Sequence, residues 1–145
     1  MENIKAIILT VIGLAGGYIS TLFGGWDMAL QTLIIFMAVD YVSGLVVAGI
    51  FKKSQKSPNG ALESKAGFKG LFKKGMALLI VLVAAQLDKV VGTDFIRNAV
   101  IIAYIANETV SITENAGLMG VHIPGPLMKA IDLLNQKVEE DNKDE

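Results

Sequence analysis

Four polar side chains between residues 95 and 118 recur at a spacing that a helix would gather on one face. Tyr104, Glu108, Ser111 and Asn115 follow one another at intervals of four, three and four positions, and residues three or four apart are neighbours on a helix surface. Glu114 flanks this face, and apolar residues occupy much of the remainder. Such a helix could line an aqueous hole, lie at a membrane interface, or satisfy its acids inside a bundle.

A further acid, Asp40, lies near the middle of an otherwise uncharged run from Met28 to Phe51. A charged side chain at the centre of a bilayer costs ~2.5–3.5 kcal/mol on insertion scales, so Asp40 needs a partner, a wet cavity or a proton. Ser43, Gly44 and Ala48 share its helical face, and such small residues let helices approach closely. Asp40 could take part in function, or it could hydrogen-bond a neighbouring helix in its neutral form.

The elements that must position these residues are membrane helices. The chain has 145 residues, of which 52% are hydrophobic, and this excess in long runs is more than a soluble domain of this size carries. We predict an all-α, polytopic membrane protein, whose four transmembrane helices cover residues 5–26, 28–51, 74–92 and 95–118. Residues 6–26 contain no charge, and this run is too long for the apolar region of a signal peptide, so we expect an uncleaved span. The third reaches sufficient length only if Lys73, Lys74 and Lys89 snorkel outward.

Most of the positive charge lies between the second and third expected spans. Residues 52–73 form the predicted basic cytoplasmic loop. The lysines singled out within it or at its edge are Lys52, Lys53, Lys69, Lys73 and Lys74. In its second half, Phe68, Leu71 and Phe72 share one helical face, which suits either a short helix on an anionic membrane surface or a solvated loop.

The distribution of basic residues predicts the orientation of the chain. With four spans, the N-terminus, the basic loop and the C-terminal tail share one side, which carries eleven basic residues against Lys89 and Arg97 on the other. Because Lys and Arg are retained on the cytoplasmic side, we expect both termini in the cytoplasm.

Residues 121–145 follow the expected membrane domain, residues 1–120. Leu127, Ile131, Leu134 and Val138 recur at helical spacing before an acidic end, which predicts a cytoplasmic amphipathic helix.

Gly13 and Gly17 form a GxxxG pair in the first expected span. Glycines at this spacing let two helix backbones approach closely. The pair could pack within one subunit or between subunits.

The sequence contains none of the residue groupings that most enzyme classes require. It has no cysteine and one histidine, so neither a thiolate nor a histidine-based metal site can form. No Ser/His/Asp grouping, phosphate-binding loop or dinucleotide motif is present. The lysine loop lacks the interleaved aromatic residues of nucleic-acid-binding modules. We therefore expect no enzyme activity, no cofactor and no nucleic-acid partner.

Several short motifs follow one another along the chain: Asp40-Tyr41-Val42-Ser43-Gly44, the lysine loop that closes with Ser64, Gly67, Gly70, Lys73 and Lys74, Leu87-Asp88, Glu108-x-x-Ser111-Ile112-x-Glu114-Asn115 and Gly120-Val121-His122-Ile123-Pro124. In this order they resemble the toxin-secretion/phage-lysis holin family of Gram-positive bacteria and their phages. The resemblance covers roughly residues 36–135. His122 departs from it, because the family has proline at this position of the turn.

The resemblance implies a non-enzymatic protein of the bacterial host's cytoplasmic membrane. Holins oligomerise there and open lesions at a set time, so that an endolysin or a toxin crosses. The implied partners are further copies of the chain, membrane lipid, the exported endolysin or toxin as cargo, and an antiholin. The alternatives are a small ion or proton channel or transporter, and an antiholin or membrane anchor that forms no pore.

Overall fold

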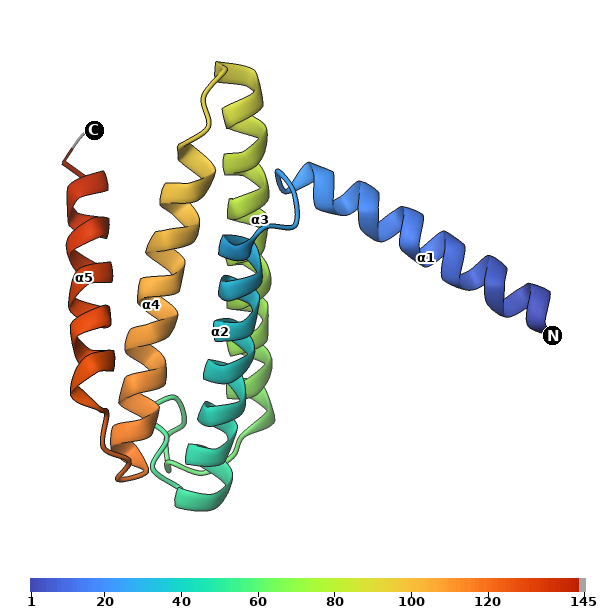
Figure 1. Cartoon of the computed structure of the whole chain (residues 1–145). Coiled ribbons are helices and arrows are strands. Elements are labelled where there is room, and N and C mark those ends of the chain that lie inside the picture. Colours follow the sequence, from blue (N-terminus) through green and yellow to red (C-terminus); the bar gives the residue numbers. More distant parts are fainter. Residues whose placement is uncertain (144–145) are drawn as a thin grey trace.

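The structure, a computed structural model, describes residues 1–143, and this part of the chain is helical with no strand. Its elements, in order, are α1 (Glu2–Leu22), α2 (Met28–Val46), the π-helical turn η1 (Val47–Phe51), α3 (Ser64–Val91), α4 (Ile96–Leu118) and α5 (Gly125–Asp141). Helices α2, α3, α4 and α5 form a bundle, and α1 projects away from it (Figure 1). The prediction of an all-α chain is confirmed for the described residues.

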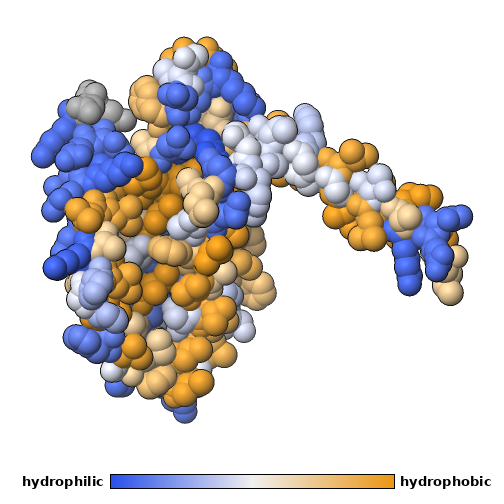
Figure 2. All heavy atoms as spheres, viewed as in Figure 1, coloured by the Kyte–Doolittle hydropathy of each residue, from blue (hydrophilic) through white to orange (hydrophobic). Residues whose placement is uncertain are grey.

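Three helical segments are long and apolar enough to cross a membrane: Glu2–Leu22, Met28–Phe51 and Ser64–Val91. Hydrophobic side chains such as Ile35, Val42 and Leu79 are exposed on the bundle. Figure 2 shows hydrophobic residues over much of the visible face of the bundle, whereas hydrophilic residues gather along α5. An apolar surface of this extent is typical of contact with lipid.

Helix α4 lies at the centre of the bundle and packs against α2, α3 and α5. The fully buried side chains Leu33 of α2, Val81 of α3 and Ile101 of α4 meet in the core. Inside a bilayer, such contacts stabilise the bundle through van der Waals packing, because lipid is as apolar as the side chains.

The third helix begins at Ser64, ten residues before the expected start of the third span. Residues 64–73 are therefore neither a separate surface helix nor part of a loop, and the connection after η1 covers only residues 52–63. Gly60 sits in this loop with a φ of +73°, and a Cβ there would collide with the Lys52 carbonyl. Only glycine adopts this conformation beside a backbone without strain.

Helix α5 lies along α4 rather than apart from the bundle (Figure 1). Ile131 is buried in this contact, and Leu134 packs against the core. Residues 121–145 therefore contain a helix that packs against the predicted fourth span, and its amphipathic, cytoplasmic character stays a prediction. Residues 144 and 145 of the expected tail lie outside the described part of the chain.

Candidate functional site

Two acids on different helices share one lysine inside the bundle. Lys74 Nζ of α3 lies 2.7 Å from Asp40 Oδ2 of α2, and it also forms an ion pair with Glu108 Oε2 of α4. The side chains are 14%, 4% and 8% exposed for Lys74, Asp40 and Glu108. One ammonium group thus satisfies two buried carboxylates, and the three groups together carry one negative charge in excess. We call them the buried charge triad.

Asn115 extends the triad towards the end of α4. Its Nδ2 donates to Asp40 Oδ1 at 3.1 Å and to Ser43 Oγ at 2.9 Å. Gly44 lies beside it, and a Cβ at Gly44 would be 3.8 Å from Asn115 Nδ2, so the absent side chain leaves room for the amide. Within residues 1–143, no buried side-chain nitrogen or oxygen lacks a hydrogen-bond partner. The polar seam between α2 and α4 is therefore fully satisfied.

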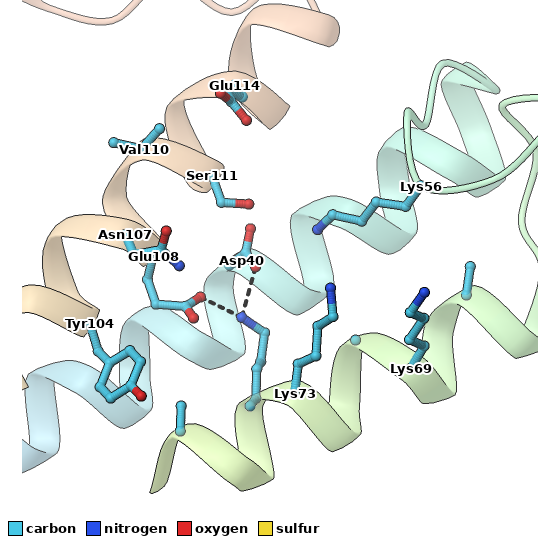
Figure 3. A pocket seen from close by; sticks show the side chains of 14 residues that line it. Asp40, Lys56, Lys69, Lys73, Tyr104, Asn107, Glu108, Val110, Ser111 and Glu114 are labelled. Carbon is cyan, nitrogen blue, oxygen red and sulfur yellow. Dashed lines mark hydrogen bonds and ion pairs between the residues drawn. The ribbon is translucent and has the colours of Figure 1, made fainter. Parts of the chain in front are cut away.

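A cavity of about 620 Å³ opens beside the triad, between α2, α3, α4 and the loop. Figure 3 shows the ammonium groups of Lys56 and Lys73 pointing into the space beside Asp40, with Ser111 and Glu114 on the opposite wall. The residues that line the cavity are Asp40, Lys56, Ala66, Lys69, Gly70, Lys73, Lys74, Ala77, Tyr104, Asn107, Glu108, Val110, Ser111 and Glu114. Charged and apolar side chains both line the cavity, which lies at the end of the bundle where α3 begins.

The structure brings most of the polar candidates from the sequence together. Asp40, Ser43, Glu108 and Asn115 form the buried seam. Tyr104, Ser111, Glu114, Lys69 and Lys73 line the cavity without entering an ion pair within residues 1–143. Their roles in function stay predictions.

The other candidates behave differently from one another. Ala48 is buried in η1, whereas Lys52 and Lys53 are exposed in the loop and do not line the cavity. A Cβ placed on Gly13 or Gly17 would meet no atom within 4 Å, so these two glycines pack against nothing within residues 1–143.

Lys74 was expected to snorkel outward, and it turns inward instead. The physical reason is that Asp40 and Glu108 need a cation once their helices are packed, and Lys74 is the basic residue of α3 that faces both of them. The sequence contained one signal for this inward position of Lys74. Asp40 and Glu108 lie within expected spans and need a cation, and Lys74 lies at the edge of the third apolar run.

A second polar cluster, which the sequence did not reveal, closes the opposite end of the bundle. Arg97 of α4 donates to Asp27 Oδ2 at 2.7 Å, to the Gly25 carbonyl at 3.1 Å and to the Phe23 carbonyl. Gln86 donates to the Leu22 carbonyl at 2.6 Å. These donors satisfy carbonyls that the end of α1 leaves without helical partners. The cluster fixes the α1–α2 turn to α3 and α4.

Asp27 and Asp88 give this cluster its negative charge. Asp27 also begins α2, because its side chain accepts from the Leu30 amide at 3.0 Å. The hydrogen bond from Arg97 lowers the pKa of Asp27 below its usual value. Asp88 accepts from the Ile96 and Arg97 amides at 3.1 and 2.8 Å, and a carboxylate at these amides stabilises the start of α4.

The arrangement holds charge within an apolar bundle. Within residues 1–143, no group of three or more His, Asp or Glu side chains could hold a metal ion. A buried ion pair of this kind is costly to break and sensitive to helix position. The triad therefore couples the relative placement of α2, α3 and α4 to the state of three charges.

Comparison with known proteins yields one family and several relatives. The model of the bacteriophage holin family matches residues 17–136. An uncharacterized 14.9 kDa protein from the nagH 3′ region of Clostridium perfringens is 39% identical over 94% of this chain and 99% of its own length. An uncharacterized protein of Listeria monocytogenes is also 39% identical, over 99% of this chain and 95% of its own length.

A relative with a functional name is the probable holin of Bacillus phage phi105. It is 29% identical over 79% of this chain and 82% of its own length. No solved structure matches the chain.

Proposed function

The chain belongs to the bacteriophage holin family, and from this premise we propose that it oligomerises in a bacterial cytoplasmic membrane and opens lesions at a timed moment. The observation that carries the proposal is the family match over residues 17–136, together with the likeness to a probable phage holin. Membership makes it a membrane protein and points to a non-enzymatic role. The proposed cargo is an endolysin or a toxin.

The exposed helix α1 supports assembly of several copies. No residue of α1 is buried, and α1 meets the bundle only near its C-terminal end (Figure 1). A helix apolar on all sides requires lipid or other helices around it. We propose that α1, with Gly13 and Gly17 at its close contact, joins neighbouring subunits.

We propose that α4 is the fourth span, with both termini in the cytoplasm. The charged side chains of Arg97 and Glu108 and the amide of Asn115 are buried in the bundle, whereas Asn98, Asn107 and Glu114 are exposed. Polar residues within a membrane bundle are expected to face its interior. The cavity and the basic loop would then lie at the cytoplasmic end, as the lysine distribution favours.

Timed release of cytosolic protein is the test of the proposed function. The protein is expressed from an inducible promoter in a bacterium that also produces an endolysin lacking an export signal, with each protein expressed alone as a control. We expect growth to stop abruptly, and lysis to require both proteins. Leakage of ions with retention of the endolysin would contradict a lesion and favour a small channel. Unbroken growth would favour an antiholin or anchor.

A further inference from the structure

We propose that the lysine-lined cavity binds the phosphate group of an anionic ligand, and that this ligand is an anionic phospholipid of the membrane. The cavity of about 620 Å³ has the size of a small-molecule site, for which about 300–1,000 Å³ is usual. The inference goes beyond pore formation, because it assigns a ligand to the bundle.

Three of the four lysines that line the cavity form no ion pair among residues 1–143, and two of them, Lys56 and Lys73, point into the space beside Asp40 (Figure 3). Lys56 comes from the loop, and Lys69 and Lys73 lie one turn apart on α3. By contrast, Lys74 is occupied by Asp40 and Glu108. Ammonium groups that converge on one space repel one another. A bound anion would remove that repulsion.

The two walls of the cavity differ in charge, which fixes where the anion sits. The unpaired lysines lie on the α3 and loop wall, whereas Glu114 is the carboxylate of the α4 wall that forms no ion pair within residues 1–143 (Figure 3). A phosphate therefore belongs beside Lys56 and Lys73, and the carboxylates of Asp40 and Glu114 oppose its binding. This asymmetry provides variants with opposite expected effects.

The surroundings of the cavity favour a lipid as the source of the phosphate. Phe72 and Met76 are exposed on α3 next to the lysines, so an acyl chain can continue along the helix from a headgroup in the cavity. Basic pockets between membrane helices on the cytoplasmic side bind anionic headgroups. A free phosphate would use the same lysines but not these apolar side chains.

Lipid retention by the purified full-length protein tests the proposal. The protein is reconstituted in vesicles of phosphatidylcholine with phosphatidylglycerol, and the phospholipid that stays bound is measured by native mass spectrometry. We expect phosphatidylglycerol to be retained over phosphatidylcholine. Lys56→Gln and Lys73→Gln should each weaken retention about fivefold, since one lysine near an anionic surface contributes about 1 kcal/mol. Glu114→Gln should strengthen retention.

Matched controls separate the cavity from diffuse surface charge. Lys65→Gln changes a lysine of the same helix and Lys53→Gln a lysine of the same loop, and neither residue lines the cavity. Both controls should retain lipid like the wild type. Equal losses in cavity and control variants, or no preference for phosphatidylglycerol, would overturn the proposal.

Inorganic phosphate distinguishes the two sources. If it displaces the lipid at low concentration and its binding is lost in Lys73→Gln, the cavity takes free phosphate and the assignment to lipid is wrong. If it fails to displace the lipid, the lipid assignment stands. Since the assay requires neither lysis nor an oligomer, its outcome is independent of the proposed holin activity.

Discussion

Lys74 is the residue on which the buried carboxylates of the bundle depend. Removal of one member of a buried ion pair leaves an uncompensated charge and destabilises a protein by ~3–5 kcal/mol. Lys74→Met should therefore lower the free energy of unfolding of the detergent-solubilised protein by a similar amount, measured by thermal unfolding. Lys65→Met is the matched control, because Lys65 is exposed on the same helix, does not line the cavity and forms no ion pair within residues 1–143.

The same residues provide a stricter version of this test. Asp40→Asn and Glu108→Gln, added to Lys74→Met, remove all three charges and keep the size of the side chains. The combined variant should recover most of the lost stability, because no charge is left buried alone. Equal stability of Lys74→Met and Lys65→Met would show that the triad does not stabilise the bundle.

The ion pair between Asp27 and Arg97, at the other end of the bundle and outside the spans, should make the stability of the protein depend on pH. The folded-state pKa of Asp27 lies below its reference value of 3.8, so its contribution to stability is present above that value and lost as pH falls through the folded pKa. Because the Asp27 side chain is 47% exposed, we expect at most about 1 kcal/mol. Asp27→Asn keeps the cap on α2 and removes the charge.

Thermal unfolding over a pH series measures this contribution. The difference in stability between wild type and Asp27→Asn should be largest near neutral pH and should shrink as pH falls below 3.8. A difference that does not change with pH would assign the effect of the substitution to the cap alone.

At the scale of elements, the positions of the helices could be predicted from the sequence better than the contacts between them. The structure has helices at Glu2–Leu22, Met28–Val46 with its π-helical turn to Phe51, and Ile96–Leu118, each close to its predicted range, because long apolar runs and helical spacing are local signals. The start of α3 was placed ten residues late. The third apolar run is bounded by Lys73 and Lys74, so hydropathy places the start of the span there. The helix itself continues through these lysines back to Ser64.

Contacts between distant residues could not be predicted in this way. Lys74 is 34 residues from both Asp40 and Glu108, and Arg97 is 70 residues from Asp27. Each residue alone suits a snorkelling or solvated position. Which lysine turns inward depends on the packing of α2, α3 and α4, and a single sequence does not contain that information.

The GxxxG pair Gly13 and Gly17 provides a test of contacts between helices of neighbouring subunits. Because nothing lies within 4 Å of a Cβ added at Gly13 or Gly17, Gly17→Leu should leave the stability of the monomer unchanged. At a close contact between copies, the larger side chain would separate the backbones. We expect fewer oligomers on crosslinking in membranes and delayed lysis, with Leu14→Val as the control. An unchanged ladder of crosslinked species would remove this face from the interface.

At the scale of the whole molecule, the position of α5 conflicts with cytoplasmic termini. Helix α5 runs back along α4, so its last turn lies towards the end of the bundle where α3 meets α4 (Figure 1). If α4 spans the bilayer and α5 stays docked, the C-terminus lies outside. The lysine distribution predicts that it lies in the cytoplasm instead.

The free energies of burial and of charge insertion favour an arrangement in which α5 has separated from α4 when the bundle lies in a membrane. Burial of Ile131, the buried residue of α5, is worth about 1.5–3 kcal/mol. Against this, Lys129, Asp132 and Lys137 are exposed on α5, and each charge at membrane depth costs ~2.5–3.5 kcal/mol. We therefore expect α5 to separate from α4 when the bundle is embedded, and to lie in the cytoplasm.

Cysteine labelling in intact cells decides between the two arrangements, because the chain has no cysteine of its own. Lys143→Cys should resist a membrane-impermeant thiol reagent until the cells are permeabilised, since undocking leaves the C-terminus inside. Asp94→Cys, in the exposed turn between α3 and α4, should react from outside without permeabilisation and serves as the control. Labelling of both positions from outside would contradict a cytoplasmic C-terminus, because it would mean either that α5 crosses the membrane beside α4 or that α4 does not span. Labelling of neither would place the α3–α4 turn inside and would contradict the four-span topology.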